Sequence, residues 1–177
     1  EIDPALTAGF VAVAAGDGVQ QLFRDLGVQQ IVSGGQTMNP STEDILHAAE
    51  QVPAMDVYVL PNNKNIVMAA EQAARLARTS GVRRIHVVPT TTIPQGISAM
   101  MAYDESAEIK DNVEAMQEAA EHVQSGSVTF AARDSDYDGH QIKEGELLAL
   151  ENGKVAFTGT DLGSVTAKVA KDLMQED

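Results

Sequence analysis

The sequence predicts an α/β fold: a mostly parallel sheet with helices on both faces, closed at the C-terminal end by a β-hairpin and a helix. Short apolar runs of strand length alternate with amphipathic stretches of helix length through residues 9–125, which is typical of a parallel sheet. After Gly126 the pattern changes to strand-like runs joined by turn residues. The 177 residues suffice for one domain with a substantial core.

Four runs in the first part have the apolar character of buried strands, and three amphipathic segments separate them. The strands are expected at Phe10–Ala15, Gln30–Ser33, Asp56–Leu60 and Arg84–Val88. The helices between them are expected at Gly18–Leu26, Thr42–Val52 and Asn63–Thr79. In the third helix, Ile66 and several alanines recur at helical spacing, which leaves Glu71 and Arg75 for solvent. This order indicates successive βαβ units.

Two further helices and a small β region are expected after the fourth strand. The helices are Gly96–Tyr103 and Glu108–Gln124, the strands Ser127–Arg133, Leu147–Leu150 and Val155–Thr158, and a final helix Asp161–Met174. Asn152-Gly153 predicts a hairpin between the last two strands, because a tight turn needs positive φ. Thr160 or Asp161 is expected as the N-cap of the final helix. We therefore expect one domain, 1–177, with a βαβ core at 9–125 and the hairpin and closing helix at 126–177.

The charge balance excludes several classes of partner. Acidic residues outnumber basic ones 26 to 12, for a formal net charge of −14, and such a chain repels nucleic-acid phosphates and anionic lipids. No apolar run approaches the ~18 residues of a membrane span, and the basic region of a signal peptide is missing at the start. With no cysteine there is no thiolate site. We expect a cytoplasmic protein, cut from a longer chain because it lacks an initiating methionine.

The four loops after the predicted parallel strands should open on one edge of the sheet, where α/β folds place ligands. Their polar groups are almost all neutral, with Lys64 as the main cation, so we expect no catalytic residue and no metal ligand among them. Glycines, neutral donors and helix N-termini suit a phosphate or carboxylate; the alternative is that they only cap helices and stabilise turns. The candidate ligand-binding residues are Gly34, Gly35, Gln36, Thr37, Asn39, Ser41, Asn62, Asn63, Lys64, Thr90, Thr91 and Gln95.

Three other motifs are weak evidence for nucleotide, calcium or nucleic-acid binding. Gly16-Asp17-Gly18 is no dinucleotide fingerprint, because Gln21 stands where the third glycine should be, and no Walker motif is present. The Asp134–Gly139 stretch is similar to the first half of a calcium loop, but Gly145 occupies the twelfth position. An acidic turn between strands is the preferred interpretation, with adventitious calcium left open. The arginines at 75, 78, 83 and 84 lack interleaved aromatics and are a weak nucleic-acid signal.

Three motifs occur in order along the chain: the Gly34–Asp44 loop, the Leu60–Asn65 segment and the Val88–Gly96 segment. Together they closely resemble the C-terminal region of the YloV-like family, the ATP-binding subunit of bacterial fatty acid kinase, which is related to dihydroxyacetone (glycerone) kinases. The resemblance runs from about Gly9 to Met174 and includes the Arg133–Gly139 turn.

The resemblance implies a DegV/dihydroxyacetone-kinase-like (EDD) fold. In the family an ATP-binding domain precedes this region, so ATP and magnesium are expected on a missing N-terminal domain and no cofactor here. The Gln36–Ser41 loop is similar to the Thr-Ser-Gln-Pro-Ser loop with which DegV-like proteins hold an acyl carboxylate. On that likeness Thr37, Asn39 and Ser41 are the contacts, although the order of residues differs. The substrate-binding histidine of dihydroxyacetone kinases has no matching motif.

The resemblance leads to two hypotheses of different classes. In the first, the chain is a non-catalytic module of a fatty acid kinase in bacterial phospholipid metabolism. It docks the acyl-binding DegV-like subunit or arranges subunits for phosphoryl transfer from ATP to a fatty acid. In the second, it holds a fatty acid, acyl phosphate, carboxylate or phosphate in the crevice at the strand ends. An independent kinase is disfavoured because the nucleotide module is absent. A homo-oligomer is left open, and neither nucleic acid nor stable membrane insertion is expected.

Overall fold

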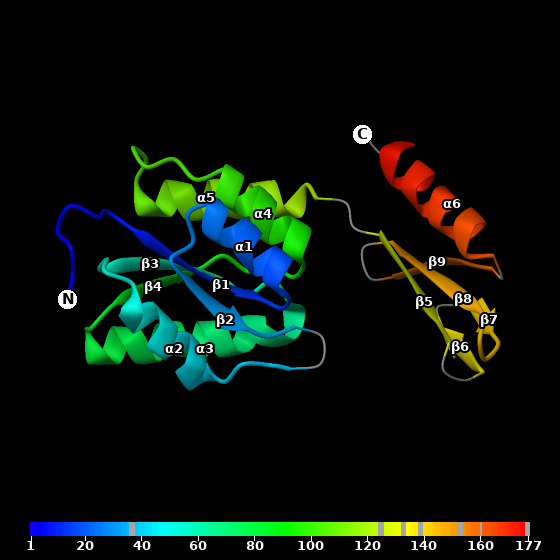
Figure 1. Cartoon of the computed structure of the whole chain (residues 1–177), viewed down its shortest axis with the longest axis horizontal. Coiled ribbons are helices and arrows are strands. Elements are labelled where there is room, and N and C mark those ends of the chain that lie inside the picture. The colour runs from blue at the N-terminus through cyan, green and yellow to red at the C-terminus, as the bar shows by residue number, and fades with distance from the viewer. Residues whose placement is uncertain are drawn as a thin grey trace. The chain divides into compact units, whose positions relative to one another are not determined.

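A computed structural model (Figure 1) describes residues 1–35, 38–123, 126–131, 134–137, 140–151, 154–159 and 161–175. Its internal contacts divide the chain into two compact units, Glu1–Val123 and Gln124–Asp177. The boundary falls close to residue 125, where the sequence pattern changes. That the two units form one domain stays a prediction.

The first unit is built on a parallel sheet of four strands. They are β1 (Gly9–Ala14), β2 (Gln30–Ser33), β3 (Asp56–Leu60) and β4 (Arg84–Val87), in the order β2-β1-β3-β4. The chain moves from β1 outward to β2 and then returns to β3 on the other side of β1. The order of the strands therefore reverses between β1 and β3, and loops that leave their carboxyl ends diverge to opposite faces.

Helices cover both faces of this sheet, as Figure 1 shows, with α1, α4 and α5 on one face and α2 and α3 on the other. Their bounds are α1 (Asp17–Asp25), α2 (Thr42–Gln51), α3 (Lys64–Ser80), α4 (Ile93–Met101) and α5 (Ile109–Glu121). Alternate strand residues separate the two cores: Phe10 and Ala12 pack on the α1, α4 and α5 side, and Val11 and Val13 on the other. The predicted α/β fold with helices on both faces is confirmed.

Element boundaries differ from the prediction by one to three residues, and the difference at the start of α4 has a clear cause. The helix expected from Gly96 begins three residues earlier, because Thr92 caps it: the Thr92 hydroxyl accepts a hydrogen bond from the Gln95 N–H at 3.2 Å. Pro94 then falls in the first turn, where its missing N–H costs no helical hydrogen bond. Gly96 consequently lies inside the helix, not at its start.

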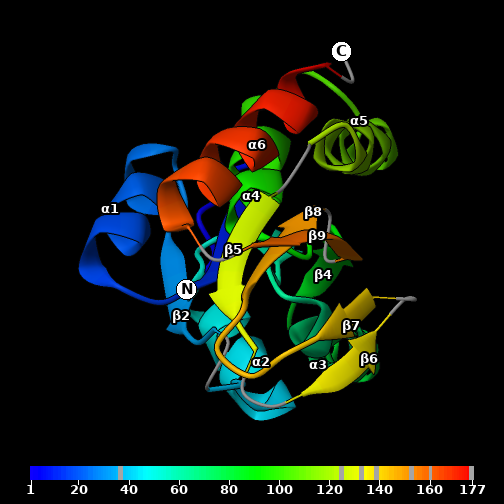
Figure 2. The same cartoon turned by 90° about the vertical axis from the view of Figure 1, so that its right-hand side faces the viewer.

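The second unit contains a three-stranded antiparallel sheet covered by one helix (Figure 2). Its elements are β5 (Gly126–Phe130), β6 (Ser135–Tyr137), β7 (His140–Ile142), β8 (Leu147–Glu151), β9 (Lys154–Gly159) and α6 (Leu162–Gln175). Leu147 and Ala149 of β8 pack against Val165 and Val169 of α6. The predicted β8–β9 hairpin and closing helix are confirmed, while Asn152 and Gly153 themselves lie outside the described residues.

Candidate functional site

The carboxyl edge of the parallel sheet is hollowed by a crevice of about 370 Å³. Its walls come from the end of β1, the loops after β2 and β3, and the start of α4. Five predicted site residues line it, namely Gly34, Gly35, Asn62, Asn63 and Thr91. The apolar part of the wall, which the sequence did not single out, comes from Val13, Ile66 and Ile93. Of the four loops predicted to open on this edge, those after β2, β3 and β4 line the described crevice, whereas Gly16–Gly18 after β1 does not.

The buried residue Asn62, which lines the crevice, links these loops by hydrogen bonds. Its side-chain amide donates to the carbonyl oxygen of Val13 at 3.0 Å, and its Oδ1 accepts from the Thr90 hydroxyl at 2.8 Å. The Asn62 backbone N–H donates in turn to the Thr90 hydroxyl oxygen at 3.1 Å. Both residues are buried. Asn62 also has a φ of 55°, a left-handed conformation that asparagine tolerates better than most residues. The Asn62–Thr90 pair joins the ends of β1, β3 and β4.

Two glycines allow the close approaches that shape the crevice. A Cβ at Gly96 would collide with Oδ1 of Asn62, so the first turn of α4 can approach that side chain only as glycine. A Cβ at Gly34 would lie 2.7 Å from Cδ of Pro40 and 3.1 Å from the carbonyl oxygen of Met38. Gly35 closes this loop by donating its N–H to the same Met38 oxygen at 2.8 Å. Gly34 and Gly35 therefore shape this loop as well as lining the crevice, and their predicted contact with a ligand stays a prediction.

Two predicted site residues, Ser41 and Asn63, cap helices. Ser41 and Asp44 form a reciprocal capping box on α2, in which the Ser41 hydroxyl accepts from the Asp44 N–H and the Asp44 carboxylate accepts from the Ser41 N–H. The Ser41 hydrogen bonds hold the pKa of Asp44 below its ordinary value. Asn63 caps α3 by accepting from the Asn65 N–H at 2.9 Å. Each cap satisfies a helix-terminal donor that an anion would otherwise bind.

The remaining predicted residues are dispersed around the crevice. Gln95 accepts hydrogen bonds from both the N–H and the hydroxyl of Thr91, at 2.7 and 2.9 Å, so these two side chains are bound to each other. Asn39 and Lys64 are exposed and do not line the crevice. Gln36 and Thr37 lie outside the described residues. No residue that lines the described crevice carries an ionisable side chain.

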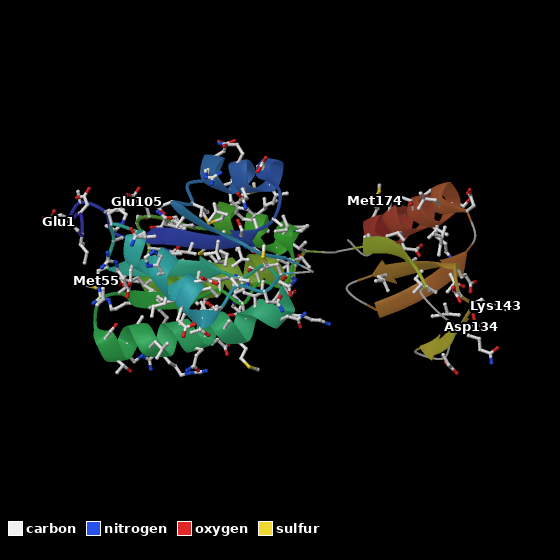
Figure 3. All side chains as sticks on the ribbon, turned by 60° about the horizontal axis from the view of Figure 1, so that its bottom comes forward. Glu1, Met55, Glu105, Asp134, Lys143 and Met174 are labelled. Carbon is white, nitrogen blue, oxygen red and sulfur yellow. The ribbon has the colours of Figure 1, made fainter. Side chains whose placement is uncertain are left out.

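Ionisable groups cluster instead at the opposite, amino end of the sheet, which Met55 marks in Figure 3. Buried Asp56 accepts two hydrogen bonds from the Arg84 guanidinium, at 2.8 and 2.7 Å, and its Oδ1 lies 2.9 Å from His86 Nε2. The Arg84 hydrogen bonds, with a smaller effect of His86, keep the pKa of Asp56 below its ordinary value despite burial. This cluster joins β3 to β4.

The acidic stretch of the second unit has strands around it, as the sequence predicted, but the two nearest strands, β6 and β7, were not among the predicted ones. Asp134, labelled in Figure 3, accepts the Glu144 N–H through its carboxylate at 2.6 Å, so one of its oxygens stabilises the turn. Asp138 and Gly139 lie outside the described residues. Among those described, no three potential ligands gather around a metal-sized space. No described helix is long and apolar enough to cross a membrane.

Comparison with known proteins identifies the family. Residues 9–177 match the family model for the C-terminal region of FakA-like fatty acid kinase subunits. The chain belongs to this family. Over 177 residues it is 43% identical to protein SH1689 of Staphylococcus haemolyticus, covering 100% of this chain and 31% of that protein. Over 169 residues it is 41% identical to protein YloV of Bacillus subtilis, covering 96% and 30%. The family expected from the sequence is confirmed, and this chain spans about a third of those relatives.

A solved structure gives a weaker match. The crystal structure of EF1359, a protein of unknown function, aligns with a TM-score of 0.46 and 12% sequence identity, covering 64% of this chain and 95% of that one. A score of this size does not establish a common fold.

Proposed function

We propose that this chain is a non-catalytic C-terminal module of a fatty acid kinase subunit. It docks the acyl-carrying partner, or arranges the subunits, while ATP and magnesium are held by another domain of the same subunit. One observation carries the proposal: the described crevice has no ionisable lining residue, and the polar side chains around it are largely bonded to one another. Membership of the FakA-like family of fatty acid kinase subunits supplies the context.

The chemistry of phosphoryl transfer explains why this observation matters. Transfer from ATP needs carboxylates that hold magnesium and cations that neutralise the phosphates. The described crevice offers neither, and Lys64, at the start of α3, does not belong to a Walker-type phosphate-cradling loop. A rigid rim of capped helix ends is better suited to presenting a surface. We further propose a DegV-like acyl-binding protein as the partner and the bacterial cytoplasm as the place of action, in a step that feeds phospholipid metabolism.

A kinase assay in trans tests this role. The isolated chain, added in excess to the complete kinase and its acyl-carrying partner, should lower the rate of acyl phosphate formation by competing for the partner. The same chain with ATP, magnesium and fatty acid should form no acyl phosphate. Product formation by the chain alone would overturn the non-catalytic assignment. Undiminished activity at saturating chain would overturn docking.

A second candidate function is ligand binding in the crevice. Its volume of about 370 Å³ lies at the low end of the ~300–1,000 Å³ typical of ligand pockets, and Val13, Ile66 and Ile93 give it an apolar wall. An acyl carboxylate or phosphate at the mouth would face the N-termini of α3 and α4. Calorimetric titration with a fatty acid and with an acyl phosphate decides. Ligand binding that Thr91→Val weakens, with Thr7→Val at an exposed position outside the crevice lining as the control, would support this function over docking.

A further inference from the structure

The outer edge of β4 is an open strand edge. In the order β2-β1-β3-β4, β4 is the last strand, and no described strand lies beyond it. Arg84 donates its N–H to the Met55 carbonyl and Val88 donates to the Val59 carbonyl, at 2.8 and 3.0 Å. Because backbone groups alternate sides along a strand, the N–H and C=O groups of Ile85 and Val87 point away from β3. This edge can accept a further strand.

A hollow flanks this edge on each face of the sheet. The one toward α3 has a volume of about 340 Å³ and is lined by Arg78, Arg83 and Ile85 among others. The one toward α5 has a volume of about 520 Å³, with Ile109 and Val113 in its wall. Arg84 and His86 border both. Side chains of an added strand would alternate between the two hollows.

The two hollows differ in charge. Residues 75–84 contain Arg75, Arg78, Arg83 and Arg84 and no carboxylate, within a chain of net charge −14. Arg83 is buried and donates to the Val52 and Glu50 carbonyls, and Arg75 donates to Gln72. Exposed Arg78 has no ion-pair partner among the described residues, which leaves its charge available. The α3 side therefore favours carboxylates.

The charged side chains on the α5 side are paired with one another. Asp56 and Glu114 lie in its wall beside the apolar side chains of Ile109 and Val113. The basic groups of this wall are already paired: Arg84 and His86 contact Asp56, and Lys110 lies 4.0 Å from Glu114. A carboxylate entering this hollow would therefore lose water without gaining an unpaired cation. An apolar side chain would meet Ile109 and Val113 instead.

We propose that the β4 edge binds an extended segment of a partner protein in which carboxylates alternate with apolar side chains. The carboxylates lie toward Arg78 and the apolar side chains toward Ile109 and Val113, while Ile85 and Val87 supply the main-chain hydrogen bonds. This surface is at the side of the sheet, away from the crevice at its carboxyl edge, so the inference goes beyond the proposed function and holds whatever the crevice binds. A short edge carrying charged residues also serves to block pairing, and the experiment separates the two roles.

The test uses the full chain, labelled with ¹⁵N, and a capped eight-residue peptide of alternating glutamate and valine. As the peptide is added, we expect the NMR signals of the Ile85 and Val87 amides to shift and then to saturate. Arg78→Glu should weaken the affinity for the peptide about fivefold, because an exposed ion pair is replaced by a repulsion. The matched control Arg24→Glu on α1 should change this affinity less than twofold. Val87→Pro removes an outward N–H without touching the bonds to β3, and it should abolish the Ile85 shift.

Several outcomes would overturn the proposal. They are the absence of binding at millimolar peptide, amide shifts confined to other strands, equal binding of a control peptide in which lysine replaces each glutamate, and equal effects of Arg78→Glu and Arg24→Glu on binding. Binding of anionic vesicles that displaces the peptide would assign the edge to a membrane surface instead. None of these readouts involves fatty acid or ATP, so failure here is distinct from failure of the proposed kinase role.

Discussion

Replacing Asn62 should destabilise the first unit more than any single hydrogen bond explains. Asn62→Ala removes two buried side-chain hydrogen bonds, to Val13 and Thr90, at about 1 kcal/mol each. Alanine must also adopt the φ of 55°, which adds about 1 kcal/mol. The expected loss of unfolding free energy is therefore about 3 kcal/mol. Asn62→Gly loses the same bonds but tolerates the backbone conformation, so about 2 kcal/mol is expected.

Urea unfolding followed by the fluorescence of Tyr58 and Tyr103 measures this difference, because both tyrosines lie in the core of the first unit. Asn39→Ala, at an exposed position, serves as the control and should change stability by less than about 0.5 kcal/mol. Equal losses for the alanine and glycine variants of Asn62 would refute the backbone argument. A loss below about 1 kcal/mol in both would refute the role of Asn62 as the link between strand ends.

Three further variants probe the same framework. Gly96→Ala should cost about 2 kcal/mol by displacing the Asn62 side chain, and less in an Asn62→Ala background, as a double-mutant cycle of unfolding would show. Arg83→Met should cost about 2 kcal/mol in urea unfolding, because it leaves the carbonyls of Glu50 and Val52 without donors. The pKa of Asp56 is lower in the folded state than its value of about 3.9 in the unfolded state. The ionised carboxylate therefore adds to the free energy of unfolding above that unfolded-state pKa, and this contribution is lost as the pH falls through the lower folded-state pKa. Asp56→Asn should therefore reduce stability at pH 7 and flatten its fall below pH 4, and an unchanged pH profile would contradict the coupling to Arg84.

The parallel sheet could be predicted because its sequence signal is redundant. β1 and β3 are buried and mainly apolar, β2 and β4 each contribute two apolar residues, and the segments between them have an apolar stripe of helical period, so pattern and topology support one another. The start of α4 differs from the prediction because Gly96 looks like a helix boundary. A glycine is required there by the Asn62 side chain, which lies more than thirty residues away in sequence. Such a contact leaves no local pattern, although Thr92 and Pro94 carry the capping signal.

The second unit could be predicted less completely for a related reason. The strands β6 and β7 are three residues each, Ser135–Tyr137 and His140–Ile142, and three residues show no reliable alternation. The sequence narrows the N-cap of α6 to Thr160 or Asp161, and Asp161 accepts the Ser164 N–H at 2.8 Å, as a capping residue does. A hydrogen bond with the Ser164 hydroxyl, together with this bond from the Ser164 N–H, lowers the pKa of Asp161.

The candidate site shows why neutral loops are ambiguous in sequence. Serine, threonine and asparagine offer the same groups to a helix N-terminus as to a ligand, so only geometry separates the two uses. Ser41, Asn63 and Thr92 each accept from a backbone N–H of their own helix. A ligand that needed those hydroxyl or amide oxygens would first have to break a cap worth about 1 kcal/mol. A ligand head group could therefore bind loosely in the crevice without breaking these caps. A head group that used the capping oxygens would require the loops to rearrange. Because tight binding would break these caps, the loops are better suited to presenting a fixed surface than to binding a substrate tightly.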